Sequence, residues 1–287
     1  MKIKFIINPI SGTGKQSRIE ELIKKNTNFE YKLVFTKRSG DATILSKKAI
    51  DEKFDVVIAV GGDGTVNECA KAIIGSKTAL GVIPCGSGNG FAFHFGMNKN
   101  IEKSILQLNS CKTSLIDSCT VNQMPFINVS GVGFDAHISH LFSNVKKRGF
   151  LSYLKLISNE IFTYKAKDYY LNYDKNNMHV KANLIAFANT SQYGNNFFIS
   201  PDASTKDGLI DFVIIKEFPK WKIIPFLYQL AKGRVHLSEY VKIIRAKEML
   251  IDSKDNILHL DGEPISTKSP IRIKAHHKTL KIFIPNE

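Results

Sequence analysis

The sequence predicts two domains: an open α/β domain at residues 1–121 and a β-sandwich with helical insertions at residues 122–287. In the first part, apolar runs rich in β-branched residues alternate with stretches of helical spacing, which is typical of a parallel sheet covered by helices. In the second part, seven short apolar runs are separated by turns, as in a β-sandwich. Glycine-rich loops follow two strands of the first part, and open α/β sheets bind their ligands at that edge.

The composition is that of a globular protein, with 43% hydrophobic and 23% charged residues among 287. A net charge of +14 predicts an acidic partner: a nucleotide, a nucleic acid or an anionic membrane. We find neither an RNA-binding aromatic signature nor a helix-turn-helix, which disfavours nucleic acid. No apolar run approaches the roughly 18 residues of a transmembrane segment, and the N-terminal run is too short for a signal peptide. We therefore expect a cytoplasmic protein.

The central feature is the apolar run Val56–Val60 and the polar turn that follows it. The run predicts a strand buried on both faces of a parallel sheet. Gly61, Gly62 and Gly64 can adopt positive φ and let a ligand approach the main chain, and Thr65 can cap the helix that follows. Such a turn predicts a phosphate site, because unpaired N–H groups and the positive end of the helix dipole point to the same spot.

Asp63 stands out in this turn, because a carboxylate repels a phosphate unless a cation lies between them or the carboxylate orients another group. We therefore interpret Asp63 as a catalytic or Mg²⁺-linked residue. The alternative is an ordinary Asp-Gly turn. The flanking glycines, the strand before and the helix after favour phosphate binding.

Three further loops are expected at the same edge of the sheet. The first strand ends at Asn8–Gly12, which lacks the spacing of a P-loop but whose backbone N–H groups could contact a nucleotide. A second strand ends at Thr36, and a fourth, Ala79–Pro84, leads into a second glycine loop at Gly86–Gly90. This loop is expected to form the other half of the pocket, since consecutive parallel strands carry their loops to one edge.

Two helical segments interrupt the strands of the second part. One carries six basic residues against one acidic residue from Lys146 to Lys167, and the other surrounds Trp221. Basic and aromatic amphipathic surfaces can lie on an anionic bilayer, where each basic residue adds ~1 kcal/mol. The alternative, a helix packed on the sandwich with a solvated basic face, is favoured by the residues alone. Membrane recruitment through the basic segment is kept as a separate hypothesis.

Six motifs occur in the order and rough spacing of the diacylglycerol kinase catalytic-domain superfamily, which includes bacterial soluble lipid kinases and sphingosine kinases. The motifs are Asn8-Pro9-x-Ser11-Gly12, Gly61–Glu68, Pro84-x-Gly86-Ser87-Gly88-Asn89, Gly131-x-Gly133-Phe134-Asp135, Asp207-Gly208-x-x-Asp211 and Asp261–Pro264. The chain resembles this superfamily over nearly its whole length. The resemblance implies a Rossmann-like, NAD kinase-like first domain and leaves open whether the last strand returns towards it.

The resemblance also implies an ATP site, a base and a metal site. The residues that match the ATP site are Asn8, Pro9, Ser11, Gly12, Thr36, Gly61, Gly62, Asp63, Gly64, Thr65, Val66, Asn67, Ser87, Gly88 and Asn89. In similar enzymes an acid of the Asp-Gly-Glu segment serves as the base, which here means Glu263 or Asp261. A structural Mg²⁺ in bacterial members lies by the motif that matches Asp207 and the carbonyl of Leu209, and Asp117 resembles an acid of a network near it.

The chain departs from the bacterial pattern at the second glycine loop. Bacterial members usually carry a second acid and an arginine where this sequence has Gly90 and Phe93, and Ser87–Asn89 looks more like the sphingosine kinase loop. The acceptor therefore stays open between a diacylglycerol-like glycerolipid and a long-chain base.

Together, the residues and the resemblance predict a lipid kinase of phospholipid biosynthesis that uses ATP and Mg²⁺, lies at the membrane periphery and phosphorylates a lipid hydroxyl. Phosphoryl transfer needs positioning and charge neutralisation above all, and Glu263 could take the proton of the hydroxyl. Composition alone would instead favour a simple hairpin turn around Asp261. Two alternatives remain: an NAD kinase-like phosphotransferase and a nucleotide-binding regulatory module without catalysis. The sequence leaves open whether the chain forms a homodimer.

Overall fold

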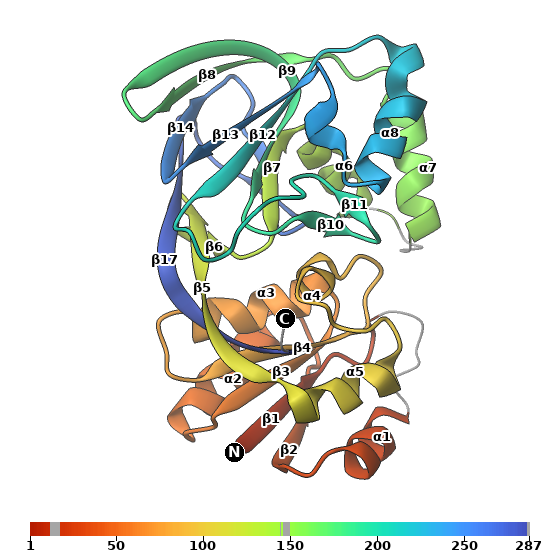
Figure 1. Ribbon diagram of the computed structural model, residues 1–287, viewed down its shortest axis with the longest axis vertical. Helices are drawn as coiled ribbons and strands as arrows, with labels where there is room; N and C mark the ends of the chain where they lie inside the picture. The colour runs from red at the N-terminus through yellow and green to blue at the C-terminus, as the bar shows by residue number, and fades with distance from the viewer. Residues whose placement is uncertain (12–17, 144, 146–149, 286–287) are drawn as a thin grey trace. The chain divides into compact units, whose positions relative to one another are not determined.

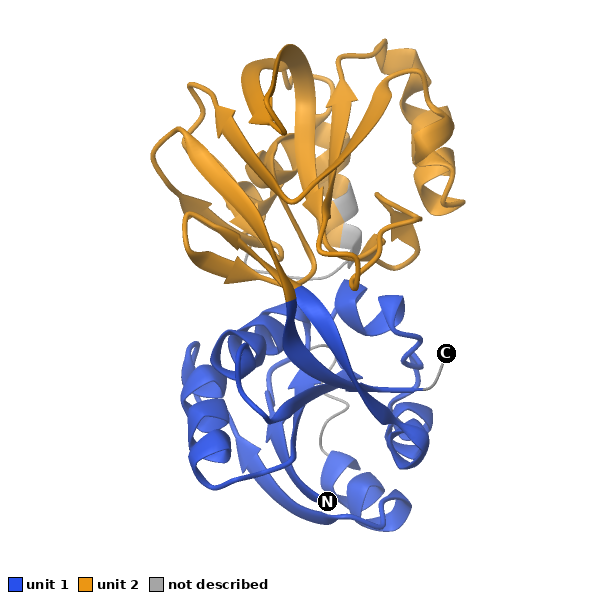
Figure 2. Ribbon diagram, turned by 60° about the vertical axis from the view of Figure 1, so that its left-hand side comes forward, with its two compact units in different colours: residues 1–117, 278–287 blue, residues 118–277 orange. Residues whose placement is uncertain are grey.

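The chain folds into two compact units, which Figure 2 shows in different colours: residues 1–117 with 278–287, and residues 118–277. The structure is a computed structural model that describes residues 1–11, 18–143, 145 and 150–285. Gly12 and the basic residues 146–148, which carry parts of the sequence predictions, lie outside the described residues.

The first unit is built on a parallel sheet. Its strands pair in the order β2-β1-β3-β4, and the end of the last strand pairs parallel to β4 through Ile282 and Leu80. Strands β3 and β4 are buried along their whole length, as expected for strands covered on both faces. The strands are β1 (Lys2–Ile7), β2 (Glu30–Phe35), β3 (Val56–Gly61) and β4 (Ala79–Pro84).

Helices connect these strands in the alternation that the sequence predicts. Helices α2 and α3 lie side by side (Figure 1), and the Thr43 hydroxyl donates a hydrogen bond to the carbonyl oxygen of Glu68 at 2.8 Å. The helices of this unit are α1 (Ile19–Asn26), α2 (Asp41–Asp51), α3 (Asp63–Ile73), α4 (Gly90–His94), α5 (Ile101–Gln107) and the 3-10 turn η2 (Leu108–Ser110).

The second unit is predominantly antiparallel. Its strands follow the order β16-β15-β7-β9-β8-β14-β17, and β12 pairs with β9 and β13. The strands are β5 (Lys112–Val121), β6 (Met124–Phe126), β7 (Val129–Gly133), β8 (Lys167–Tyr173), β9 (Asn176–Ala188), β10 (Gln192–Gly194), β11 (Phe197–Phe198), β12 (Ile210–Lys216), β13 (Val241–Ala246), β14 (Glu248–Asp252), β15 (Ile257–Leu260), β16 (Glu263–Ser266) and β17 (Ile271–Ile284). The first residues of β5 and the last residues of β17 belong to the first unit.

Both faces of the central antiparallel strands are buried. Phe187 and Phe212 belong to one apolar cluster, whereas Val213, the next residue of β12, belongs to another together with Phe226 and Leu230 of α8. Helix α8 therefore covers one face of the sheet. The helical elements of this unit are α6 (Phe134–Ser143), α7 (Phe150–Glu160), η3 (Lys220–Lys222), α8 (Ile223–Ala231) and η4 (Val235–Leu237).

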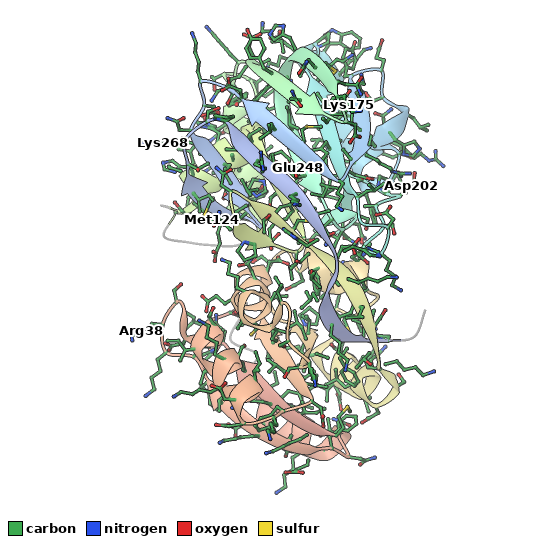
Figure 3. The ribbon with its side chains drawn as sticks, turned by 90° about the vertical axis from the view of Figure 1, so that its left-hand side faces the viewer. Arg38, Met124, Lys175, Asp202, Glu248 and Lys268 are labelled. Atoms are coloured by element: carbon green, nitrogen blue, oxygen red, sulfur yellow. The ribbon has the colours of Figure 1, made fainter. Side chains whose placement is uncertain are left out.

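Ion pairs at the surface link the side chains of the paired strands β14 and β17. Glu248, labelled in Figure 3, lies 3.3 Å from Arg272 Nε and 3.9 Å from Lys274 Nζ. Pairs this exposed add little to stability, so the buried apolar clusters hold the sheet together. The fold class predicted from the sequence, α/β followed by a β-sandwich with helical insertions, is confirmed. Among the described residues, no helix is long and apolar enough to cross a membrane.

Candidate functional site

The loops that follow β3 and β4 are in direct backbone contact. A Cβ added to Gly86 would lie 2.4 Å from the Cα of Gly62, and one added to Gly62 would lie 3.1 Å from the Cα of Gly86. The backbone N–H of Cys85 donates to the carbonyl oxygen of Gly61 at 2.8 Å. The sequence prediction that these two glycine loops meet at one edge of the sheet thus agrees with the geometry of the first unit.

Positive φ, the reason expected from the sequence for the glycines after β3, is wrong. Gly61, Gly62 and Gly64 do not have positive φ, and the φ of Gly62 is −92°. Glycine is needed at two of these positions because space is short: a Cβ on Gly61 would lie 2.5 Å from Thr65 Oγ1, and Gly62 faces the Gly86 backbone. Close packing, rather than a left-handed conformation, explains this part of the motif.

Asn89 ties the second loop to the first. It has a left-handed backbone (φ 58°, ψ 38°) in the N-cap position of α4. Its side chain accepts a hydrogen bond from the Gly86 N–H at 2.8 Å and donates one to the Gly86 carbonyl oxygen at 2.7 Å. Its own N–H donates to Asp63 Oδ2 at 2.8 Å. Asp63 therefore orients another group, one of the two roles that the sequence left open for a carboxylate beside a phosphate site.

Thr65 is not the cap of α3, contrary to the sequence prediction. The helix begins two residues earlier, at Asp63, with Gly62 in the N-cap position, so Thr65 lies buried within the first turn. Its hydroxyl accepts a hydrogen bond from Asn8 Nδ2 at 3.1 Å. The side chain of Asn8 also accepts from the Ile10 N–H at 3.2 Å. Asn8 therefore connects the loop after β1 to the start of α3.

The remaining residues predicted for the nucleotide lie around the same strand ends, apart from Gly12, which is outside the described residues. Thr36 directly follows β2, and its N–H donates to the Ile7 carbonyl oxygen at 2.9 Å. Ser11 N–H donates to the Asn8 carbonyl oxygen at 3.3 Å. Val66 and Asn67 are buried in α3, Gly88 is half-buried, and the exposed members are Pro9 and Ser87.

The Asp-Gly-Glu segment forms a two-residue hairpin turn. Leu260 at the end of β15 pairs with Glu263 at the start of β16, and Asp261 and Gly262 between them have φ values of 49° and 89°. Two positive φ values are typical of a type I′ turn, for which Asp-Gly is a preferred sequence. The hairpin that composition favours is thus present, and it presents Glu263 as an exposed side chain.

The side chain of Asp261 is buried and engaged with the backbone. Its Oδ2 accepts a hydrogen bond from the Ile127 N–H at 3.0 Å, and its Oδ1 accepts one from the Asn128 N–H at 2.9 Å. Its own N–H donates to the Ser130 hydroxyl at 3.1 Å. Asp261 thereby satisfies the donors of the segment between β6 and β7. Which of the two acids serves as a base stays a prediction.

A buried network holds the same turn from the other side. The Gly262 N–H donates to His259 Nδ1 at 3.2 Å, so the proton of the neutral ring is on Nε2, which donates to Asp135 Oδ2 at 3.0 Å. The Tyr193 hydroxyl donates to the same oxygen at 2.9 Å, and the Ser139 hydroxyl donates to the Gly262 carbonyl oxygen at 2.6 Å. Burial, the charge of Asp135 and the hydrogen bond to it raise the pKa of Tyr193 well above its usual range, which keeps the phenol protonated.

Sequence reasoning missed most of this network. It assigned no role to His259, Ser139 or Tyr193, and it noted Asp135 only as part of a motif. The signal was present for one of them, because His259 lies four residues before Glu263 in the same hairpin. Gly131 of that motif is also explained, since a Cβ there would lie 2.6 Å from Asp135 Oδ2.

The predicted metal ligands lie in a turn before β12. Asp207 Oδ1 accepts a hydrogen bond from the Leu209 N–H at 3.0 Å. Asp211 is buried and is hydrogen bonded by Ser200 Oγ and by Arg245 Nε. Burial raises the pKa of Asp211, and the nearby charge of Asp207 raises it further, against the opposing effects of Ser200 and Arg245. Within the described part of the chain, no group of three His, Cys, Asp or Glu side chains is arranged to hold a metal ion.

Asp117, the last of the predicted acids, is buried at the point where β5 passes β17. Its Oδ1 accepts a hydrogen bond from the Lys278 N–H at 2.7 Å. This contact joins the two strands that run from one unit into the other. A role for Asp117 near a metal stays a prediction.

Comparison with known proteins identifies the family. Residues 2–121 match the model of the diacylglycerol kinase catalytic domain, and residues 128–284 match that of the YegS C-terminal NAD kinase beta sandwich-like domain. The chain belongs to the diacylglycerol kinase catalytic-domain superfamily. The resemblance inferred from the six motifs is therefore confirmed, and the chain is an enzyme of the lipid kinase family.

Individual relatives agree over nearly the full length. Diacylglycerol kinases of Staphylococcus epidermidis and Staphylococcus aureus are each 27% identical over 295 residues, covering 100% of this chain and 93% of theirs. A crystal structure of a Bacillus anthracis protein matches with a TM-score of 0.81 at 24% identity, covering 99% of this chain and 95% of that one. At this identity the structural likeness concerns the fold.

The contact between the two glycine loops predicts the effect of Gly86→Ala. A Cβ on Gly86 would lie 2.4 Å from the Gly62 Cα and 2.9 Å from Asn89 Oδ1, so the backbone of one of the two loops has to shift. We expect a loss of about 1–3 kcal/mol in the free energy of unfolding, measured by urea denaturation. Ser87→Ala, an exposed change in the same loop, is the control and should leave stability unchanged. Equal stability of both variants would show that the loops do not pack as described.

The different surroundings of the two acids in the hairpin predict different effects on stability. Asp261→Ala leaves two buried backbone N–H groups without their acceptor and should lower the free energy of unfolding by about 1–3 kcal/mol. Glu263→Gln changes an exposed side chain and should leave the stability at its wild-type value. Thermal unfolding of the two variants side by side measures the difference. A Glu263→Gln variant as unstable as Asp261→Ala would contradict the assignment.

Proposed function

We propose that this chain uses ATP and Mg²⁺ to phosphorylate a membrane lipid. The γ-phosphate of ATP is transferred to a hydroxyl group of the lipid. The observation that supports this most directly is the backbone contact between the loops after β3 and β4, beside the first turn of α3. The first N–H groups of a helix lack partners within it, and the helix dipole adds positive potential at that end. Two packed glycine loops at such a position suit a triphosphate.

The predicted nucleotide residues divide into binding and orienting groups in this proposal. The main chain of Gly61–Thr65 and Ser87–Asn89 would bind phosphate oxygens, and Asn8 and Thr36 would border the nucleotide. Asp63 would act indirectly, because its carboxylate holds the N–H of Asn89 at 2.8 Å and so fixes the spacing of the two loops. A link from Asp63 to the nucleotide-bound Mg²⁺ is part of the same proposal.

Glu263 is the proposed general base. Its exposed carboxylate would take the proton of the acceptor hydroxyl as that oxygen attacks the γ-phosphorus. Three hydrogen bonds hold the two-residue turn before it. Gly262 accepts one from the Ser139 hydroxyl and donates one to His259, and the Asp261 carboxylate accepts one from the Asn128 N–H. A base on such a rigid turn keeps its position during the reaction, which is what phosphoryl transfer requires of the protein.

Asp207 and the Leu209 carbonyl are the proposed ligands of a structural Mg²⁺. A carboxylate and a carbonyl oxygen are the hard donors that Mg²⁺ prefers, and this ion usually keeps several waters, so two protein ligands fit it. The N–H of Leu209 already orients one oxygen of Asp207. A cation held there would offset the repulsion between Asp207 and Asp211, which contributes to the raised pKa of Asp211.

For the acceptor, a diacylglycerol-like glycerolipid is favoured over a long-chain base, because the staphylococcal relatives are named diacylglycerol kinases. The glycine at position 90, where bacterial members usually carry an acid, lies buried at the start of α4.

We propose a cytoplasmic enzyme at the periphery of an anionic membrane, in line with the net charge of +14 and with the exposed Lys155 and Lys165 of the basic segment.

Transfer of label from ATP tests the activity. Purified protein is incubated with γ-labelled ATP, Mg²⁺ and a mixed lipid extract, with NAD added in a parallel reaction. We expect one labelled lipid, lost when Mg²⁺ is removed by chelation, and no labelled NAD. Labelled NAD would identify an NAD kinase-like phosphotransferase. ATP binding without any labelled product would identify the non-catalytic module.

Glu263→Gln tests the base. We expect the rate of lipid phosphorylation to fall by ~10²-fold or more, with ATP binding unchanged, because the amide cannot accept the hydroxyl proton. Steady-state kinetics measure the rate, and an ATP binding titration measures the affinity. Glu248→Gln, which removes a half-buried carboxylate of the same unit that pairs with Arg272, is the control and should keep the full rate. An active Glu263→Gln variant would rule out Glu263 as the base.

A further inference from the structure

One side of helix α8 exposes large apolar side chains. Ile224 is 79% exposed, Trp221 just before the helix 74%, and Tyr228 60%. Their spacing of three and four residues places them on one side of the helix. Phe226 and Leu230 lie on the other side and are buried against the sheet. We call Trp221, Ile224 and Tyr228 the α8 face. Single exposed apolar residues are common on proteins, but a row of three on one helix indicates an interaction surface.

The start of this face is fixed to a neighbouring element. Lys220 Nζ donates hydrogen bonds to the carbonyl oxygens of Ile161 at 2.6 Å and Tyr164 at 3.2 Å, just beyond the end of α7. Phe162, which is 64% exposed, lies in the segment between these carbonyls. These hydrogen bonds tie the start of the α8 helix region to the turn that follows α7.

The charges around the α8 face are mainly positive. Lys232 Nζ lies 5.9 Å from the centre of the Tyr228 ring. Lys222 Nζ lies 5.3 Å from the centre of the Trp221 ring, and Glu239 offsets its charge through an ion pair at 2.6 Å. Aromatic side chains bordered by lysines suit the interface of an anionic bilayer, where the rings enter the headgroup region and the ammonium groups meet the phosphates. The charged residues of segment 216–242 are Lys216, Lys220, Lys222, Lys232, Arg234, Lys242, Glu217 and Glu239.

We infer that the α8 face docks the protein on an anionic lipid bilayer by inserting Trp221, Ile224 and Tyr228 at the interface. This inference deepens the proposed function, on which it rests for the choice of a bilayer as the partner. It assigns docking to an element other than the basic segment after α6, and it adds apolar insertion to the electrostatic attraction. A second copy of this chain could instead cover the α8 face. The experiment with the double variant below distinguishes this dimer from docking on a bilayer.

Trp221 is the only tryptophan of the chain, so its fluorescence reports directly on the α8 face. The full-length protein is titrated with vesicles of phosphatidylcholine alone and with vesicles that also contain phosphatidylglycerol. We expect the emission of Trp221 to shift to shorter wavelengths with the anionic vesicles, and lipids with brominated acyl chains to quench it. Added salt should weaken the binding, because screening reduces the attraction of the lysines. No change in emission while the protein sediments with the vesicles would overturn the inference.

The double variant Ile224→Ser, Tyr228→Ser keeps the reporter and removes two exposed side chains. We expect its affinity for anionic vesicles to fall by about tenfold or more. The matched control is Ile44→Ser, Leu106→Ser, two helical positions of the first unit that are 50% and 47% exposed, and it should bind like the wild type. Equal binding by the wild type and the first double variant would overturn the inference. A wild type that is dimeric without lipid, beside a monomeric first variant, would assign the face to a second copy instead.

The fluorescence titration needs neither ATP nor turnover, so its result is independent of the kinase assay. A protein that inserts Trp221 into anionic vesicles but labels no lipid keeps the docking face and loses the proposed reaction. The opposite outcome is also possible to recognise. If the wild type and the first double variant phosphorylate a soluble short-chain lipid at the same rate, and the Trp221 emission does not shift with vesicles, the proposed reaction stands and the docking face is ruled out.

Discussion

The contact between two backbones, at Gly62 and Gly86, is the constraint on which the candidate phosphate site depends. The two backbone segments approach so closely that a methyl group on Gly86 would overlap the Gly62 Cα, at 2.4 Å, and one on Gly62 would lie only 3.1 Å from the Gly86 Cα. The hydrogen bond from the Asn89 N–H to Asp63 then fixes one loop against the first turn of α3. A parallel sheet brings the loops to the same edge, but this contact determines their spacing, and the spacing decides which ligand they can bind.

The second unit separates two roles between neighbouring acids. Both carboxylate oxygens of Asp261 accept hydrogen bonds from backbone N–H groups, which stabilises the turn. Glu263, two residues later, is exposed. His259 and Asp135 support the same turn through Gly262. The proposed role of Glu263 needs such an arrangement, because a reacting group has to be both accessible and held in place.

The α8 face fits the nature of the proposed substrate. A kinase that acts on a membrane lipid has to meet its substrate at the bilayer. The proposed docking through the α8 face would give such a protein a reversible attachment, because it would combine burial of apolar surface with attraction to anionic headgroups. The protein would then meet its lipid substrate in the same bilayer on which it docks.

The sequence by itself determined the fold class, the two glycine loops at the sheet edge and the Asp-Gly hairpin. These features depend on residues close together in the chain: the spacing of apolar residues in strands and helices, and the turn preference of Asp-Gly. The family resemblance added the candidate roles of the loop residues. Two predictions from the sequence were wrong: Thr65 as the helix cap, and positive φ as the reason for the glycines at positions 61, 62 and 64.

Only the tertiary structure decided which groups touch. It showed that Gly61 and Gly62 are needed for space, that Asp63 binds an N–H 26 residues away, and that Asp261 binds backbone donors 133 and 134 residues away. It also brought His259 to Asp135, 124 residues apart. No local pattern encodes such contacts, because they form only when separate strands and helices pack, and packing decides which polar groups are buried and must find a partner.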